Sequence, residues 1–298
     1  MKQFFSELYK KISMSKPGKA MLKVLARLRI DRFMYFIVDL FDPDFTDKDV
    51  EEAKAFFEAH KKDVKDILDQ LSDDLSYNTY KCMINYRISG KRRFVLSVCK
   101  PVKDRYILRD TKGRIIPVMG DESIADCGAY TGDDLENFVK QKITFREYYA
   151  FEPDESNIVE GEKVYSLPGV ELFKYAVGEK DEICHFDKGG GKGANPVGKL
   201  SDSGSLTVQV KSLDDVLDKR RVTMIKMDIE GAEMAAIKGA SNIITEQKPL
   251  LAISIYHSNS DMIEILRYIK TLVPEYKFYC RHYSYGYADT ILYAVNDR

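Results

Sequence analysis

The chain has 298 residues, of which 44% are hydrophobic and 31% are charged, so it can build a large core and is neither disordered nor fibrous. Its formal net charge of −1 gives no electrostatic reason to expect a nucleic-acid partner. The five cysteines are scattered without CxxC spacing, which favours reduced thiols in a cytoplasmic protein. The most apolar run, residues 33–38, is far shorter than the roughly 20 residues that span a bilayer, so we expect no transmembrane segment.

Residues 1–105 are expected to form a mainly helical N-terminal region. Residues 21–41 mix apolar and basic side chains at helical spacing, and Pro43 ends this stretch. Thr46 is the expected N-cap of a helix that runs to about His60, and residues 63–71 continue the helical period. Three roles remain open for this region: a cap over the substrate, an element of a homodimer interface, or a docking arm.

Strands and helices alternate from about residue 121 onward. This alternation predicts an α/β fold for residues 106–298, a doubly wound, Rossmann-like, mostly parallel sheet of about seven strands, with ligands bound at the carboxyl ends of the strands. Two further strands flank a loop rich in Gly and Ser at 188–204, which is either a flexible hairpin or a lid. The main strands are expected at 123–127, 148–151, 170–177, 224–227, 250–255, 277–280 and 290–295, and the flanking ones at 183–186 and 205–210. Helices are expected at 133–142, after Glu155 and at 261–273, and an Ala-rich stretch at 233–240 separates two of the strands.

The first expected strand runs into D-C-G-A-Y-T-G-D, residues 126–133, directly before a helix. Glycine at position 128 allows a sharp turn and a close approach of the backbone to a ligand, and the first N–H groups of the helix face that ligand. The spacing DxGxxxG differs from the GxGxxG that favours a pyrophosphate, and the carboxylate of Asp126 suits the ammonium group of S-adenosylmethionine. We therefore expect cofactor contacts from this loop. The predicted residues are Asp126, Gly128, Ala129, Tyr130, Thr131 and Gly132.

Two further strand ends complete the expected cofactor site. Glu152 lies 20 residues after Gly132, the distance at which an acidic residue binds ribose hydroxyls in Rossmann-like folds. Ala176 ends the expected third strand and is small enough to pass the edge of an adenine ring. S-adenosylmethionine is accordingly the expected cofactor.

A late motif, I-K-M-D-I-E-G-A-E at residues 225–233, places three carboxylates within six residues at a strand end. Such a cluster is costly without partners, because like charges raise one another's pKa. If S-adenosylmethionine donates its methyl group to an alcohol, that alcohol must lose a proton to a general base. Histidine has the best intrinsic pKa for this role. We expect Asp228 to orient the cofactor or the acceptor and His257 to be the base. The full set of candidate catalytic residues is Asp228, Glu230, His257 and His282.

A divalent metal is the alternative explanation for those four side chains, because carboxylate and imidazole suit several ions. No HxH or HExxH spacing supports a metal site, so none is expected.

The segment at residues 226–233 resembles the K-x-D-x-E-G-A-E signature of the FkbM-type methyltransferases. Residues 126–133 resemble the first motif of that family, residues 151–153 its ribose motif, and residues 213–215 its L-D-D segment. The resemblance covers about residues 107–295 and implies S-adenosylmethionine-dependent methyl transfer, in many members O-methylation of a sugar hydroxyl on a glycan or natural product. This chain departs from many members at His257, where they carry an acidic residue.

Two other classes of function remain as alternatives. A nicotinamide-dependent oxidoreductase would also use the strand–glycine–helix unit and Glu152, but the spacing led by Asp126 and the late acidic motif do not suit it. A non-catalytic nucleotide-binding module would keep the fold without chemistry. The presence of carboxylates at Asp126 and Glu152 argues against a non-catalytic module.

Overall fold

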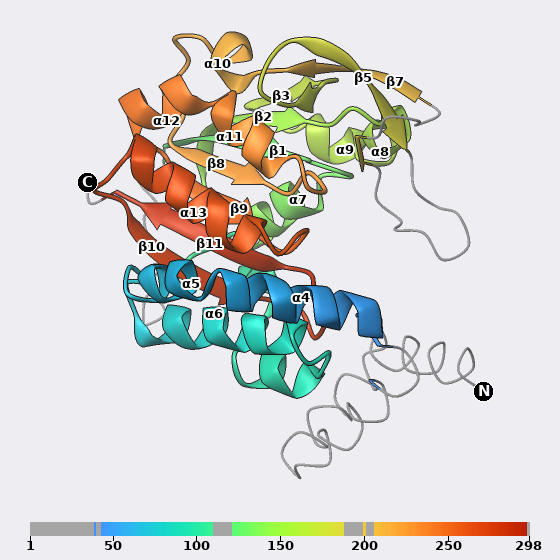
Figure 1. Ribbon diagram of the computed structural model, residues 1–298. Helices are drawn as coiled ribbons and strands as arrows, with labels where there is room; N and C mark the ends of the chain where they lie inside the picture. Colours follow the sequence, from blue (N-terminus) through green and yellow to red (C-terminus); the bar gives the residue numbers. More distant parts are fainter. Residues whose placement is uncertain (1–38, 40–42, 110–120, 188–198, 201–205, 297–298) are drawn as a thin grey trace, which may run out of the picture.

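The computed structural model describes residue 39 and residues 43–109, 121–187, 199–200 and 206–296 of the chain. Its centre is a seven-stranded sheet in the order β10-β11-β9-β8-β1-β2-β3 (Figure 1). All neighbouring pairs are parallel except those of β11, which runs antiparallel to both of its neighbours. The predicted doubly wound α/β sheet is therefore confirmed. The strands are β1 (Glu122–Cys127), β2 (Phe145–Phe151), β3 (Val170–Phe173), β8 (Met224–Met227), β9 (Leu250–Ser254), β10 (Lys277–His282) and β11 (Thr290–Val295).

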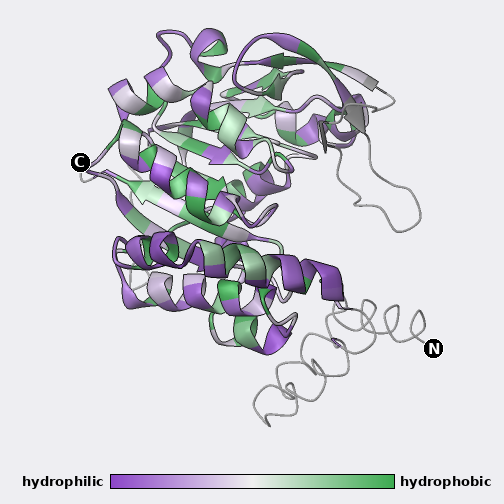
Figure 2. Ribbon diagram, in the orientation of Figure 1, coloured by the Kyte–Doolittle hydropathy of each residue, from purple (hydrophilic) through white to green (hydrophobic). Residues whose placement is uncertain are grey.

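Helices cover both faces of this sheet, as right-handed crossovers require when the strand order reverses between β1 and β8 (Figure 1). The residues of β1, β9 and β11 are buried along the whole strand, which explains the nearly continuous apolar sequences of β9 and β11. Figure 2 shows that the strands of the large sheet are more hydrophobic than helices α4 and α5. The helices of this part are α7 (Asp133–Lys140), α8 (Glu155–Glu160), α9 (Glu162–Tyr165), α10 (Leu213–Val216), α11 (Glu233–Lys238), α12 (Ser241–Gln247) and α13 (Asp261–Leu272).

The strand register brings the sequence motifs together. Asp126 on β1 is paired with Lys226 on β8, and with Ala150 on β2 on its other side. Because the three strands are parallel and in register, the residues that follow them emerge at one edge of the sheet. Gly128 and Glu152 therefore lie next to the late acidic motif.

The expected third strand, residues 170–177, is two strands that belong to different sheets. The first part is β3, at the edge of the large sheet, and the second is β4 (Ala176–Val177). β4 pairs with β7 (Leu206–Lys211) in a smaller sheet ordered β4-β7-β5-β6, in which β5 is Glu182–Asp187 and β6 is Lys199–Leu200. The prediction of one strand was wrong because Ala176 is buried against Val208 and Val210 of β7. A run of apolar residues does not reveal which strand it pairs with. The expected pair around the loop is confirmed as β5 and β7, and most of the loop lies outside the described residues.

The described part of the N-terminal region is helical, as predicted. It holds α4 (Asp47–Ala59), α5 (Lys61–Leu68), α6 (Asp74–Arg87) and the 3-10 helices η1 (Arg92–Ser97) and η2 (Val102–Asp104). Thr46 caps α4, because its Oγ1 accepts the Asp49 N–H at 3.2 Å while the Asp49 carboxylate accepts the Thr46 N–H at 2.8 Å. The expected helix at 21–41 lies outside the described residues apart from Asp39, and the division at 105/106 stays a prediction. None of the helices in the described part of the chain has the length and apolar character that crossing a membrane requires.

Helix α6 attaches this helical region to the sheet. It packs against β10, and the Tyr80 hydroxyl donates to the Met262 carbonyl at 2.5 Å. At its other end, the Arg87 guanidinium donates to the Tyr256 carbonyl and, at 2.9 Å, to Asn259 Oδ1. Arg87 is buried, so these bonds fix the loop that follows β9.

A buried ion pair at the start of α6 predicts a pH dependence of stability. Asp73 caps the helix and lies 2.6 Å from Arg281 on β10. Burial raises the pKa of Asp73, but hydrogen bonds from Arg281 and Ser76 outweigh burial and hold it below its ordinary value. A depressed folded pKa means that the stabilisation is present above the unfolded pKa and is lost as the pH falls through the folded pKa.

We therefore expect the free energy of unfolding to fall between about pH 5 and pH 2, and Asp73→Asn to flatten that part of the profile. At neutral pH the variant should be less stable by about 3 kcal/mol, because it leaves the Arg281 charge buried without a carboxylate. Urea denaturation as a function of pH measures both quantities. Asp74→Asn, at the first residue of the same helix, is the control. A wild-type-like acid slope in Asp73→Asn would contradict the prediction.

Candidate active site

A cavity of about 250 Å³ opens at the carboxyl ends of β1, β2 and β8. Parallel sheets of this class bind ligands at this edge, where the strand order reverses. Its wall includes residues after all three strands, together with β4 and the segment after η2. The lining residues are Arg105, Gly128, Tyr130, Asp133, Asp134, Phe151, Glu152, Pro153, Asn157, Tyr175, Ala176, Val177, Lys226, Asp228, Ile229, Glu230, Ala232, Tyr256 and Asp289.

Glycine at position 128 is required by a contact within the protein. Its φ of +79° lies in the left-handed region, and a Cβ on this residue would stand 2.1 Å from the carbonyl oxygen of Asp228. Any side chain would therefore push apart the loops that follow β1 and β8. The sharp turn predicted for this glycine is confirmed by its φ, whereas the contact with the Asp228 carbonyl was not predicted.

The carboxylate of Asp126 has a partner inside the protein. It is fully buried, 2.8 Å from the Lys226 ammonium and 2.5 Å from the Tyr148 hydroxyl. Lys226 also lies 3.3 Å from Asp134. Burial lowers the pKa of Lys226, but the charges of Asp126 and Asp134 outweigh burial and hold the pKa above its ordinary value. The ammonium that Asp126 binds is thus that of Lys226, and among the described residues Asp126 does not belong to the cavity wall, which does not fit the predicted direct contact with the cofactor.

Glu152 is held in place at the end of β2 by three donors. Its Oε2 accepts the Tyr130 N–H at 2.9 Å, and its Oε1 accepts the Asp154 N–H at 2.8 Å and the Asn157 side-chain amide at 3.1 Å. The residue is 5% exposed and lines the cavity, and burial raises its pKa. Each carboxylate oxygen has two lone pairs, so the three protein donors leave one acceptor site, on Oε2, for a hydroxyl of a ligand.

The other predicted cofactor contacts divide into two groups. Tyr130 and Ala176 line the cavity, as do Gly128, Glu152 and Asp228. Ala129, Thr131 and Gly132, like Asp126, are not part of the wall in the described structure. Gly132 instead caps α7 with a φ of +76°, where a Cβ would stand 3.0 Å from Val164. Binding roles for all nine residues stay predictions.

Asp228 follows β8 and is fixed by three donor groups. Its Oδ2 accepts the Tyr106 hydroxyl at 2.6 Å, and its Oδ1 accepts the Tyr256 hydroxyl at 2.8 Å and lies 3.2 Å from His257 Nε2. Burial raises the pKa of Asp228, but these hydrogen bonds and the nearby Lys226 charge hold it well below its usual range. Asp228 is therefore an ionised, rigidly oriented carboxylate on the cavity wall.

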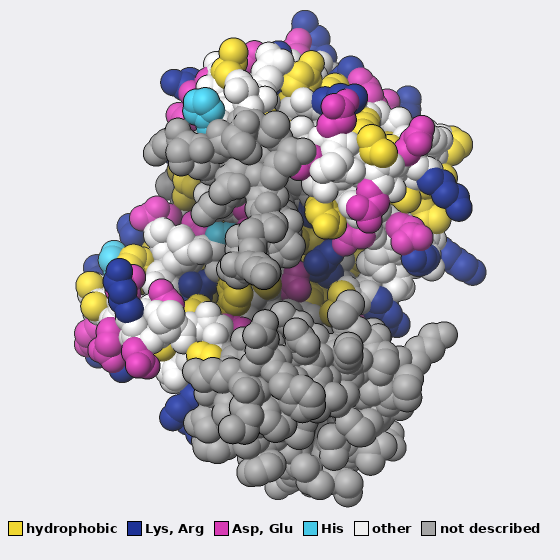
Figure 3. Space-filling view, turned by 90° about the vertical axis from the view of Figure 1, so that its right-hand side faces the viewer, with side chains coloured by type: hydrophobic (Ala, Val, Ile, Leu, Met, Phe, Trp, Pro, Cys, Tyr) yellow, Lys and Arg dark blue, Asp and Glu magenta, His cyan; other side chains and the backbone are white. Residues whose placement is uncertain are grey.

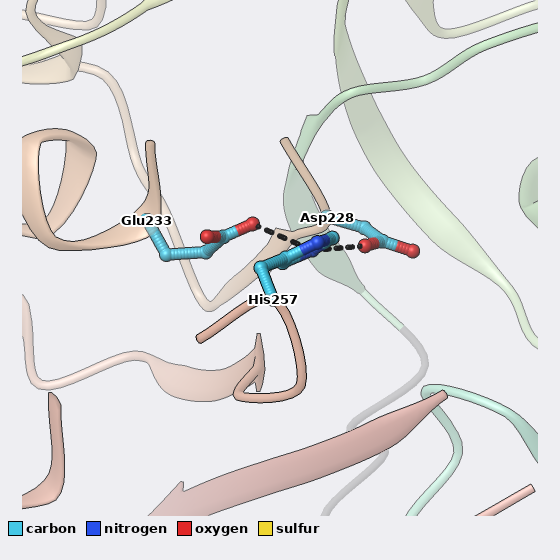
Figure 4. A group of neighbouring side chains, drawn as sticks. All are labelled: Asp228, Glu233 and His257. Carbon is cyan, nitrogen blue, oxygen red and sulfur yellow. Dashed lines mark hydrogen bonds and ion pairs between the residues drawn. The ribbon is translucent and has the colours of Figure 1, made fainter. Parts of the chain in front are cut away.

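His257 lies between carboxylates (Figure 4). Its Nε2 is 3.2 Å from both Asp228 Oδ1 and Glu233 Oε1, and its Nδ1 is 3.6 Å from Glu230 Oε2. Burial lowers the pKa of His257, but the hydrogen bonds to Asp228 and Glu233 outweigh burial and raise it to about 10. The imidazole is then protonated at neutral pH, and a protonated imidazole does not accept a proton. This arrangement does not suit the predicted role of general base.

His282 is not brought to this cluster. It is the last residue of β10, is fully buried and lies 2.9 Å from Thr290 Oγ1 through Nδ1. Burial lowers its pKa to about 4, and in the described structure it does not line the cavity. The carboxyl-end rule located the residue on the correct edge of the sheet, but its side chain points into the core.

Several residues of the site were not predicted. Glu233 was seen only as part of the late motif, yet as the fully buried first residue of α11 it contacts His257. Arg105 joins three carboxylates on the wall, at 2.9 Å from Asp133 and Asp134 and 3.0 Å from Asp289. Arg105 lies before β1 in a segment without a recognisable motif, whereas Glu233 begins the Ala-rich stretch that the sequence shows between two strands.

Comparison with known proteins identifies the family. Residues 126–285, more than half of the chain, match the family model for the methyltransferase FkbM domain. In structure, the chain is similar to the methyltransferase FkbM from Methylobacillus flagellatus KT, with a TM-score of 0.66 and 26% identity, covering 81% of this chain and 60% of that one. The chain thus spans less than two thirds of that protein.

More distant solved structures include an rRNA methylase from Streptococcus thermophilus, with a TM-score of 0.38 and 16% identity over 60% of this chain and 89% of that one. Another is a Streptococcus mutans methyltransferase in complex with SAH, with a TM-score of 0.36 and 12% identity over 66% of this chain and 99% of that one. No curated protein matches the chain in sequence. On the evidence of the family match, the chain belongs to the methyltransferase FkbM family.

Proposed function

We propose that this methyltransferase uses S-adenosylmethionine to methylate a hydroxyl group on a sugar, glycan or natural-product acceptor. The observation that carries the proposal is that Glu152 and Asp228, two carboxylates held rigidly by protein donors, line the same cavity at the carboxyl edge of the sheet. Glu152 suits the ribose of the cofactor, and Asp228 suits the hydroxyl of the acceptor.

The residues present fit the cofactor. Glu152 keeps an acceptor site on Oε2, which suits a hydroxyl of the ribose. Ala176, Val177 and Phe151 give the same cavity apolar contacts for an adenine ring. The sulfonium and ammonium groups of the cofactor are cationic, and the wall holds more carboxylates than basic groups. The proposed binding residues are accordingly Gly128, Tyr130, Glu152 and Ala176.

When bound, the cofactor would supply a methyl group on a sulfonium, whose carbon an acceptor oxygen could attack in line with S-adenosylhomocysteine as the leaving group. The protein must align the acceptor oxygen with the carbon–sulfur axis, and such positioning supplies much of the rate. Asp228 is suited to this role because three donors fix its orientation. We propose that it accepts a hydrogen bond from the acceptor hydroxyl, and that His257 holds Asp228 in position.

Cofactor binding is the first test. We expect calorimetric titration to show that S-adenosylmethionine and S-adenosylhomocysteine bind and that NAD does not. Glu152→Gln should weaken both by about 10- to 100-fold, because an amide offers one acceptor oxygen in place of two and the buried N–H partners lose a charged acceptor. Glu155→Gln, an exposed glutamate on α8, is the matched control and should bind normally.

Binding of NAD alone would overturn the proposal in favour of an oxidoreductase. An assay with sugar acceptors then tests the acceptor class, and the released S-adenosylhomocysteine is the quantity measured. Methylation of nitrogen or carbon in place of oxygen would overturn that part.

A further inference from the structure

We propose that Asp228, Glu233 and His257 bind one divalent metal ion, of which Mn²⁺ is the representative, at the acceptor end of the cavity. The three side chains come from separate segments: the ends of β8 and β9 and the start of α11. One ligand atom from each lies within 4.8 Å of the other two. Figure 4 shows the imidazole of His257 between the two carboxylates.

The spacing of the donor atoms suits a metal ion. His257 Nε2 stands 3.2 Å from Asp228 Oδ1 and 3.2 Å from Glu233 Oε1. With metal–ligand bonds of roughly 2.1 Å, adjacent donor atoms of a six-coordinate ion stand about 3 Å apart. Two carboxylates and one imidazole form a mixed oxygen and nitrogen set, which suits Mn²⁺ and similar ions. An ion bound here would replace the proton on His257 Nε2, because a metal ligand is the neutral imidazole, and the side chains would need to move little.

The environment of Glu233 provides independent support. This glutamate is fully buried, and its Oε2 has no hydrogen-bond partner in the described structure. A buried carboxylate oxygen without a partner costs free energy, so it calls for a ligand. Its Oε1 is oriented by the Ile229 N–H at 2.8 Å, and Asp228 is oriented by the Tyr106 and Tyr256 hydroxyls. Metal sites orient their ligands through outer contacts of this kind.

The charge of the cavity favours a cation as well. Its wall includes six carboxylates, from Asp133, Asp134, Glu152, Asp228, Glu230 and Asp289, against the two basic groups of Arg105 and Lys226. On the outer face shown in Figure 3, the described acidic and basic side chains are instead interspersed. A cleft lined by one sign of charge concentrates ions of the opposite sign.

The location gives the ion a role, and this part rests on the proposed function. Asp228 lines the cavity, so an ion bound to it is within reach of the acceptor. A divalent cation lowers the pKa of a coordinated hydroxyl, and the released proton passes to solvent. The acceptor oxygen then forms a bond to the methyl carbon as the carbon–sulfur bond breaks, which leaves methylated acceptor and neutral S-adenosylhomocysteine. The ion would thereby take over the task that was predicted for a histidine base.

Titration of chelator-treated full-length protein with MnCl₂ tests the site. Loss of the electron paramagnetic resonance signal of free Mn²⁺ counts the bound ions, with and without S-adenosylhomocysteine. We expect one ion per chain, bound at least about tenfold more weakly by Glu233→Gln and by His257→Ala. Asp133→Asn removes a carboxylate from the cavity wall that takes no part in the cluster, and we expect its affinity to stay within about twofold of wild type.

Absence of Mn²⁺ binding to the wild type would overturn the proposal, and so would equal weakening by Asp133→Asn and Glu233→Gln, which would indicate general attraction to an acidic cavity. Binding of S-adenosylhomocysteine to each variant confirms that it is folded. It also separates the two proposals: retained binding without Mn²⁺ uptake overturns only the metal site, whereas failure of the wild type to bind S-adenosylhomocysteine overturns the proposed function.

Discussion

Asp228→Asn is expected to lower kcat/KM for methyl transfer by about 10³-fold while S-adenosylhomocysteine affinity stays within about threefold of wild type. The carboxylate is ionised and fixed by Tyr106, Tyr256 and His257, and an amide of the same size keeps the shape but loses the charge. Loss of a group that orients or activates the acceptor typically costs 10²- to 10⁴-fold in rate. Steady-state kinetics with a fixed acceptor, together with calorimetry, separate the effects on rate and on cofactor binding.

Tyr106→Phe is the graded companion to this variant. It keeps the Asp228 charge and removes one of the donors that orient it, so we expect a loss of about tenfold in kcat/KM. Near wild-type turnover by Asp228→Asn would contradict the proposed role. A loss of S-adenosylhomocysteine affinity greater than about tenfold would assign Asp228 to the cofactor instead of the acceptor.

Lys226→Met is expected to lower the free energy of unfolding by about 4 kcal/mol, a large share of the 5–15 kcal/mol typical of a domain. The Lys226 ammonium is almost fully buried and lies 2.8 Å from Asp126, which would be left as a buried charge without a counter-ion. Asp134 would keep Arg105 as its partner at 2.9 Å, so the penalty falls mainly on Asp126. Denaturation by guanidinium chloride measures the change.

The double variant Lys226→Met, Asp126→Asn provides the control. Neutralising both members removes the stranded charge, so we expect the pair to recover about half of the loss caused by Lys226→Met alone. Strict additivity of the two single variants would show that the ion pair is not the source of the effect. A cost below about 1 kcal/mol for Lys226→Met would contradict the prediction outright.

The elements that the sequence predicted best are those whose burial is complete. Residues 290–295 form β11 with the expected bounds, because the apolar run after Thr290 is buried throughout and leaves few alternatives. Residues 224–227 also form β8 as expected, although Lys226 interrupts that run. Helix α6 shows the opposite case. It buries Ser76, Thr79 and Arg87 on its packed face, so its polar side chains concealed an interior helix within a region expected only to be helical overall.

The site was predictable where it follows strand ends and hidden where it depends on register or on distant segments. Glu152 and Asp228 were placed on the cavity by the rule for parallel sheets. The pairing of Asp126 with Lys226 depends on which residues of β1 and β8 are neighbours, which no local pattern specifies. Arg105 reaches the same cavity from outside the sheet, and only the tertiary fold reveals it.

The hydrogen bonds that Arg87 donates to the loop after β9 have a thermodynamic consequence. Its guanidinium is buried and donates to the Tyr256 carbonyl and to Asn259 Oδ1, one residue before and two residues after His257. Detaching α6 would therefore leave both the loop carbonyl and a buried charge without partners. We therefore expect the helical region and this end of the cavity to unfold as one cooperative unit and not as independent modules. Any ligand that stabilises the loop stabilises α6 by the same free energy, although the helix itself does not line the cavity.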